Sequence, residues 1–154
     1  MKMDGNIRVF TDVRYKELYN NMKNSGAVED SHELFFLCSC LGYKKGNPIS
    51  ITKRDERFWS RTITTREWAC YYAMVLEKNC FDYEKVSDDK DVLAIIEGYA
   101  NAGMEILIDE FLGDFLLSNT RNTNPQLDST FCKELTKQFV HFIFEQAESD
   151  SLGG

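Results

Sequence analysis

The sequence has 154 residues, of which 43% are hydrophobic and 13% aromatic, so it carries enough apolar mass for one domain with a real core. Its formal net charge of −7 argues against a general affinity for nucleic acid, and no apolar run approaches the roughly 18 residues that a membrane span requires. Because residues Met1–Asn6 are already polar, a secretory signal is not expected, and we predict one cytoplasmic domain over 1–148 with a flexible tail at 149–154.

The first part of the chain predicts two helices. Residues 11–24 place apolar side chains near one helical face, behind Thr11 or Asp12 as a capping residue. A second helix is expected to start near Asp30 and to run through residues 34–43, which are apolar almost all round. A helix of that composition belongs at the centre of a core.

Residues 49–63 have a different pattern, in which β-branched and polar side chains alternate. Such alternation is typical of short strands, and the charged residues in its middle are typical of a turn. We therefore predict a small β-hairpin near 49–63.

The second half of the chain predicts three more helices. Their ranges are 65–79, 91–117 and 127–147, of which the second is either one long helix or two in tandem. Thr64 or Thr65 can cap the first of them. In the long helix, the small residue Gly103 would let another helix approach closely and Asn101 could form a hydrogen bond across the contact, and we expect that helix to be the one at 34–41. The predicted fold class is mainly α, a compact domain of about five helices with a small β-hairpin.

Charge is distributed unevenly along the chain. From Tyr43 to Arg66 the sequence has seven bases and two acids, whereas from Glu67 onward it has 17 acids and six bases. Bases on a hairpin can neutralise phosphates or an acidic protein, and an aromatic ring can stack on an unpaired base. The interaction candidates in this segment are Lys44, Lys45, Lys53, Arg54, Arg57, Trp59 and Arg61. Nucleic acid, an acidic protein partner and an ordinary solvated hairpin all remain open as explanations.

Few residues offer catalytic chemistry. Two pairs of carboxylates lie four residues apart on the long helix, Glu105 with Asp109 and Glu110 with Asp114. Each pair could present two carboxylates to a divalent ion, but the solvated face of an acidic helix explains them equally well. His32 and His141 fit no triad or metal spacing, and no Gly-rich phosphate-binding loop precedes a base. We predict no catalytic residue and no cofactor.

The chain has five cysteines, an odd number, and most of them lie inside apolar stretches. Free thiols in such stretches pack as small hydrophobic groups, so we expect them to be reduced and buried. Cys38 and Cys40 form a C-x-C pair, but two residues apart on a helix their sulfurs point about 200° apart around the axis and cannot share a metal. We therefore predict no metal site.

Two phrases of the sequence carry a family resemblance. The first is Phe35–Leu37, leading through Leu41–Gly46 (LGYKKG) to Pro48, and the second is Tyr99–Leu107 (YANAGMEIL) after an acidic stretch. In this order and spacing, over residues 11–112, they resemble the small DNA-phosphorothioation-associated family labelled Dnd system-associated protein four. The helix after Asn119 lies outside the family pattern, and cysteines 38 and 40 stand where the family is more often aliphatic. These departures point to a divergent branch in another defence system.

The resemblance implies a protein encoded beside DNA-modification, restriction or other anti-phage genes, and it implies no established catalytic residue. We therefore predict a non-catalytic accessory or adaptor subunit of a bacterial anti-phage defence complex, whose larger ATPase or nuclease subunit supplies the chemistry. Direct contact with DNA stays open. The alternatives are a DNA-binding regulator of a defence operon, which would need a helix-turn-helix that is not evident, and a small metal-dependent nuclease using the acids around Asp109.

Overall fold

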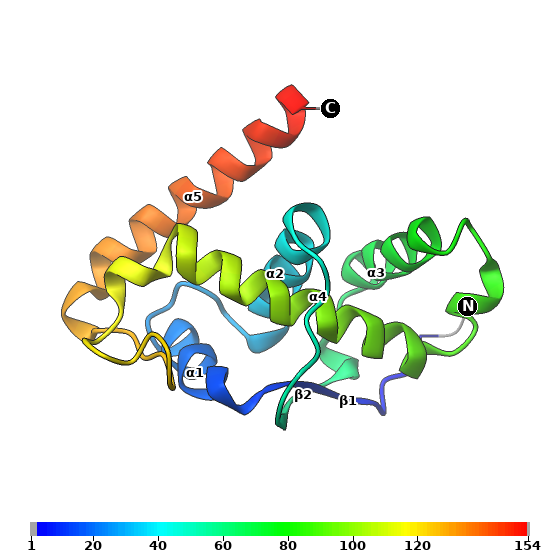
Figure 1. The fold of residues 1–154 in the computed structure, drawn as a ribbon, viewed down its shortest axis with the longest axis horizontal. Helices are drawn as coiled ribbons and strands as arrows, with labels where there is room; N and C mark the ends of the chain where they lie inside the picture. The colour runs from blue at the N-terminus through cyan, green and yellow to red at the C-terminus, as the bar shows by residue number, and fades with distance from the viewer. Residues whose placement is uncertain (1–2, 154) are drawn as a thin grey trace.

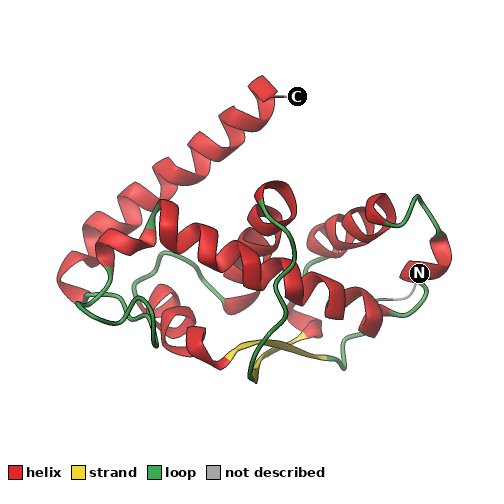
Figure 2. Cartoon of the chain, viewed as in Figure 1, coloured by secondary structure: helices red, strands yellow, loops and turns green. Residues whose placement is uncertain are grey.

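The computed structural model describes residues 3–153, with side chains for residues 3–148, and confirms the mainly α fold class. Figures 1 and 2 show five α-helices and a two-stranded antiparallel sheet at one edge of the molecule. The helices are α1 (Lys16–Asn24), α2 (Ser31–Lys45), α3 (Thr65–Lys78), α4 (Asp89–Glu110) and α5 (Cys132–Gly153), and the strands are β1 (Arg8–Asp12) and β2 (Arg54–Trp59). None of the described helices combines the length and the apolar character needed to cross a membrane.

The centre of the fold is the contact between α2 and α4, which cross in the middle of Figure 1. Two glycines let the backbones touch. A Cβ atom on Gly103 would lie 1.6 Å from the carbonyl oxygen of Cys38, and one on Gly42 would lie 1.9 Å from that of Tyr99. The predicted close packing of the long helix on the apolar helix is therefore confirmed, and both contacts exclude any side chain larger than hydrogen.

The sheet corrects the position of the predicted hairpin. Only β2 lies within residues 49–63, and it pairs with β1, so the two strands are more than 40 residues apart in the sequence. The predicted helix over 11–24 was also wrong at its start, because Thr11 and Asp12 belong to β1 and α1 begins at Lys16. A periodicity judged in a short window cannot reveal a strand whose partner is this distant.

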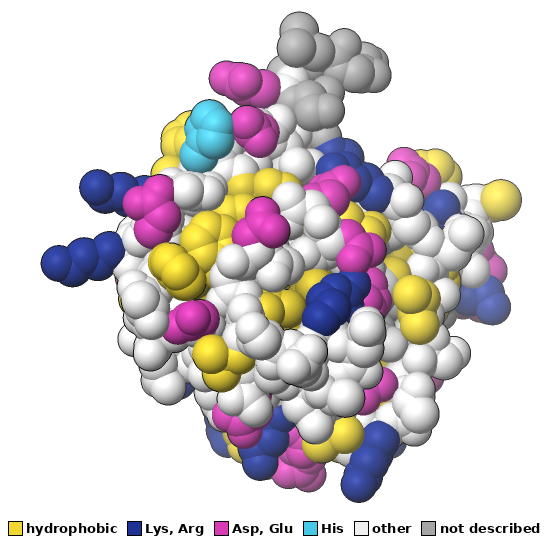
Figure 3. Space-filling view, turned by 60° about the vertical axis from the view of Figure 1, so that its left-hand side comes forward, with side chains coloured by type: hydrophobic (Ala, Val, Ile, Leu, Met, Phe, Trp, Pro, Cys, Tyr) yellow, Lys and Arg dark blue, Asp and Glu magenta, His cyan; other side chains and the backbone are white. Residues whose placement is uncertain are grey.

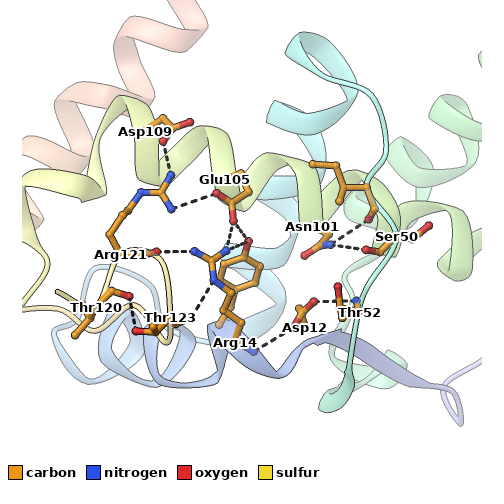
Figure 4. Close-up of polar contacts among 12 residues, drawn as sticks. Asp12, Arg14, Ser50, Thr52, Asn101, Glu105, Asp109, Thr120, Arg121 and Thr123 are labelled. Atoms are coloured by element: carbon orange, nitrogen blue, oxygen red, sulfur yellow. Dashed lines mark hydrogen bonds and ion pairs between the residues drawn. The ribbon is translucent and has the colours of Figure 1, made fainter.

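Residues 49–53, which were predicted to form part of the hairpin, instead continue from residues 46–48 as an extended segment that crosses α4 (Figure 4). The amide of Ile49 donates to the carbonyl oxygen of Gly98 at 3.0 Å. The side-chain amide of Asn101 donates to the carbonyl oxygens of Ile49 and Ser50 at 3.1 and 3.2 Å. At the end of the segment, the amide of Thr52 donates to Asp12 Oδ2 at 2.9 Å. Asn101 therefore fixes this segment on α4.

Thr64, one of the two predicted capping residues, caps α3, and it does so as part of a capping box with Glu67. The amide of Glu67 donates to Thr64 Oγ1 at 3.1 Å, and the amide of Thr64 donates to Glu67 Oε1 at 3.0 Å. These two bonds satisfy two backbone donors that a helix N-terminus otherwise leaves without partners.

We expect Thr64→Ala to lower the free energy of unfolding by about 1 kcal/mol, because the cap acceptor is lost. Thr65→Ala is the matched control, since Thr65 is an exposed residue one position along without a cap role, and it should change stability by less than about 0.5 kcal/mol. Urea unfolding monitored by circular dichroism measures both variants. Equal losses in the two would contradict the cap assignment.

The C-terminal part departs from the predicted boundaries. The long helix ends at Glu110 and is followed by a short 3₁₀ turn at Leu112–Phe115, while α5 begins at Cys132 and not at residue 127.

The buried side chains Leu135, Phe139 and Phe142 of α5 face the main core, and the rings of Phe139 and Phe142 pack on that of Phe111. The rest of α5 projects from the body in Figure 1. The helix continues to Gly153, whereas Gly154 and the side chains of 149–153 lie outside the described parts, so the flexible tail stays a prediction.

Candidate interaction surface

The predicted basic residues occupy two separate places. Lys44 and Lys45 end α2, where Lys45 Nζ lies 3.0 Å from Glu110 Oε2, while Arg54 starts β2, where its Nη2 lies 3.4 Å from Glu97 Oε1. Because α4 rises 1.5 Å per residue, the thirteen residues from Glu97 to Glu110 separate these two places by about 20 Å. The basic segment is therefore continuous in sequence but not in space.

The second place carries three arginines that lie over two aromatic rings of the sheet, Trp59 and Phe10. We call Arg8, Arg54, Trp59 and Arg61 the arginine–tryptophan surface. Trp59 is 37% exposed, and the guanidinium carbons of Arg8 and Arg61 lie 4.6 and 5.0 Å from the centre of its ring. Arg8 stands directly opposite Trp59 in the antiparallel register, which explains the first contact. Arg54 lies over the ring of Phe10, 4.0 Å from its centre.

Part of the positive charge on this surface is already neutralised within the protein. Arg8 Nη2 lies 3.0 Å from Glu56 Oε2, and Arg54 is paired with Glu97. Arg61 and Lys53, by contrast, have no carboxylate of the described residues within ion-pair distance. The surface therefore keeps a positive charge for a partner beside the exposed Trp59 ring.

Arg57 does not belong to this surface, contrary to the prediction. Its side chain is only 6% exposed, its Nε donates to Thr11 Oγ1 at 2.8 Å, and its Nη2 lies 2.7 Å from Asp55 Oδ2. The cause is a β-bulge: Val9 pairs with Phe58 and Phe10 pairs with Glu56, so Arg57 is the extra residue of β2. A bulge breaks the alternation of side chains along a strand, and here it turns this arginine inward.

Sequence reasoning missed Arg8, because it lies 36 residues before the basic segment and only the β1–β2 pairing brings it to Trp59. The stretch Arg8–Thr11 (RVFT) does contain the β-branched and aromatic residues that favour strands. That local signal could have identified β1, although it could not have identified its partner.

A buried carboxylate lies behind the surface. Glu97 accepts a hydrogen bond from the amide of Phe10 at 2.9 Å and pairs with Arg54. Burial raises its pKa, and the hydrogen bond and the arginine oppose that rise without cancelling it. An open groove of about 690 Å³ lies beside Glu97, between the N-terminal segment, β1 and α4. Its lining includes Arg8, Arg54 and Asp91. Charges of both signs line it, as in a solvated groove.

The predicted carboxylate pair on α4 is held by arginines (Figure 4). Glu105 pairs with Arg14 and accepts a hydrogen bond from the hydroxyl of Tyr15, and Arg121 Nη1 lies 3.3 Å from its Oε2. Arg121 also pairs with Asp109. Burial raises the pKa of Glu105, but the bonds from Tyr15 and Arg14 outweigh it, so the pKa lies below its ordinary value.

Each of the two histidines lies beside a glutamate, and the cysteines are free thiols. His32 Nδ1 lies 2.9 Å from Glu67 Oε1, and His141 Nε2 lies 2.9 Å from Glu145 Oε1 one helical turn away.

The five thiols are free, and Cys38 is buried as predicted while Cys80 is exposed. Burial raises the pKa of Cys40 to about 12, which leaves it unreactive. Within the described residues, no group of three His, Cys, Asp or Glu is arranged to hold a metal ion.

The arginine–tryptophan surface thus offers exposed guanidiniums and one large, partly exposed ring in contact with two of them. Such groups can pair with carboxylates or phosphates and can stack on planar groups, and tryptophan and arginine are enriched among the residues that dominate protein–protein binding energies. Comparison with protein-family models, with curated proteins and with solved structures finds no match to this chain.

Proposed function

We propose that the protein is a non-catalytic accessory subunit of a bacterial anti-phage defence complex, and that its arginine–tryptophan surface docks on an acidic surface of a larger partner protein. The resemblance to the Dnd-associated family supports the cellular setting. The observation that carries the docking role is the exposed ring of Trp59 in contact with the guanidiniums of Arg8 and Arg61. A ring held in place by two cations loses little conformational freedom when a partner covers it.

A protein partner fits this surface better than nucleic acid does. Glu56 and the carboxylate of Glu97 lie among the arginines, and they would repel a phosphate backbone. The net charge of −7 would also slow the approach of nucleic acid. A partner protein can place its acidic groups against Arg61 and Lys53 and keep them away from Glu56.

The nuclease alternative has little support in the surroundings of its proposed acids. Arginines already neutralise Glu105 and Asp109, so a divalent ion would have to displace both ion pairs. Carboxylates that form ion pairs within the protein, as Glu105 and Asp109 do, agree better with a non-catalytic accessory role.

The first test is affinity purification of the tagged protein from cells that express its neighbouring genes, followed by mass spectrometry. Recovery of an ATPase or nuclease subunit in a fixed ratio is the expected result. Recovery of the chain without any other subunit would overturn the accessory role.

With that partner in hand, we expect Trp59→Ala and Arg61→Glu each to weaken binding at least about ten-fold, because each removes a central contact. Lys85→Glu is the control, since it makes the same change of charge as Arg61→Glu at an exposed residue of the Tyr83–Val86 turn, outside this surface. It should bind like the wild type in isothermal titration calorimetry. Unchanged affinity in both surface variants would remove the surface from the contact. Salt-sensitive DNA binding lost in the same variants would assign the surface to nucleic acid instead.

A further inference from the structure

The outer face of α5 carries an apolar stripe that packs on nothing in the described part of the chain. Val140, Ile143 and Phe144 are 49, 40 and 65% exposed. Their spacing of three and four residues places them on one side of the helix. The buried Phe139 and Phe142 occupy another side and anchor α5 on the ring of Phe111. Thus α5 has two apolar faces, and only one of them is used by the fold.

The position of α5 makes this stripe accessible. In Figure 1 the C-terminal half of the helix extends away from the other elements, and Figure 3 shows hydrophobic side chains reaching the surface among charged ones on this side of the molecule. A large aromatic ring such as Phe144 is rarely left in water on a helix that could bury it. A partner that covers the stripe would remove this unfavourable exposure.

The charges along α5 indicate what that partner is. The first half of the helix carries Lys133 and Lys137 with one acid, Glu134, whereas the second half carries Glu145 and Glu148 with no base among the side chains described. Two copies placed side by side in the same direction would bring like charges together. Two copies placed in opposite directions bring the basic half of each against the acidic half of the other, and this arrangement also opposes the helix dipoles.

We infer that the protein self-associates through an antiparallel pair of α5 helices, with Val140, Ile143 and Phe144 of each copy at the seam. When Val140 of one copy faces Ile143 of the other, Lys137 falls opposite the turn between Phe144 and Glu148 of the second copy. Its aliphatic stem can then cover the ring, and its ammonium can pair with the carboxylate. A two-fold contact of this kind is self-complementary and closes at two copies. The inference is independent of the proposed function, because it involves a different surface.

The contact is small, since it uses about three turns of one helix from each copy. Interfaces below roughly 1,200 Å² are usually weak, so the dimer should dissociate on dilution. Sedimentation velocity from about 5 to about 500 µM should show the mass rise from 17.9 kDa toward twice that value. Ile143→Glu and Phe144→Glu should each stay monomeric over the whole range with unchanged circular dichroism, because both side chains are exposed in the monomer.

The control for these variants is Tyr83→Glu, which replaces an exposed aromatic residue far from α5 in the chain and should leave the dimer intact. A wild-type chain that is monomeric at every concentration would overturn the inference. So would a dimer that survives Ile143→Glu.

The antiparallel direction has its own test. Lys137→Glu and Glu148→Lys should each weaken the dimer about five-fold or more, whereas an equimolar mixture of the two variants, or the double variant, should recover it. In a parallel pair each residue would face its own copy, so each single variant would only exchange one like-charge contact for another and leave the dimer unweakened. The mixture would then bring opposite charges together in either direction, so the single variants and the double variant are the ones that distinguish the two arrangements. Single variants that leave the dimer as strong as the wild type, or a double variant that fails to recover it, would rule out the antiparallel arrangement.

Discussion

Replacement of Gly103 by alanine should lower the free energy of unfolding by about 3 kcal/mol or more, the largest effect that we expect from any single methyl group in this protein. The added Cβ would lie 1.6 Å from the carbonyl oxygen of Cys38 and 2.9 Å from its Cα. These are backbone atoms, which cannot turn aside as a side chain can. The helices α2 and α4 would have to separate, and the buried side chains between them would lose their packing.

A matched control lies on the same helix. Alanine at Gly98 would place its Cβ 3.2 Å from the Cβ of Pro48, a tight contact with a side-chain atom of the extended segment, which can yield. The gain in helix propensity partly offsets that contact, so we expect a net change within about 1 kcal/mol. Urea unfolding of both variants measures the difference. A Gly103→Ala variant as stable as Gly98→Ala would show that the two backbones do not touch.

The α2–α4 contact could be predicted from the sequence because its signals are local. The apolar character of residues 34–43 indicates a buried helix, and Gly103 indicates a close neighbour for the long helix. Asn101, which was expected to bond across the same contact, binds the extended segment at Ile49 and Ser50 instead. The β1–β2 pairing could not be predicted in this way. Each of these short strands forms only by pairing with the other, and the chain between them contains the helices α1 and α2.

Only part of the candidate surface could be predicted, because only some of its residues are identified by local features of the sequence. Trp59 and Arg61 could be named as candidates because charge and aromatic character are local properties of the sequence, and both side chains are exposed. Their role in binding stays a prediction. Arg8 was missed, because its place depends on the strand register. Arg57 was misjudged, because a bulge changes the side on which a residue lies and no local pattern records it.

The second large effect is expected at Glu105, which joins three parts of the chain. Its carboxylate binds Arg14 and Tyr15 in the 3₁₀ turn before α1, and Arg121 in the loop after α4. Arg14 in turn donates from Nε to the carbonyl oxygen of Thr123 at 2.9 Å. Glu105→Gln keeps the shape but leaves the half-buried Arg14 without its ion pair, so we expect a loss of about 2 kcal/mol in the free energy of unfolding.

Glu110→Gln is the control for this variant, because it removes a carboxylate from the same helix that pairs with Lys45 at an exposed position. We expect it to change stability by less than about 1 kcal/mol. Limited proteolysis should also cleave the loop of residues 116–128 faster in Glu105→Gln than in Glu110→Gln, since only the first change removes one of the two carboxylates that hold Arg121 of this loop on α4. Equal stability and equal cleavage in the two variants would contradict a tethering role for Glu105.

The contribution of Glu105 should also depend on pH in a defined direction. Its pKa in the folded protein lies below the ordinary value of 4.5, so at pH values between the two the unfolded chain binds more protons than the folded protein. The stabilisation is therefore complete above pH 4.5 and is lost as the pH falls through the folded-state pKa. Because other carboxylates also titrate in this range, the quantity to measure is the difference in stability between wild type and Glu105→Gln. That difference should shrink toward low pH, whereas the corresponding difference for Glu97→Gln should move in the opposite direction, because burial raises the pKa of Glu97. A difference for Glu105→Gln that stays constant from neutral pH downward would mean that its charge does not hold the network together.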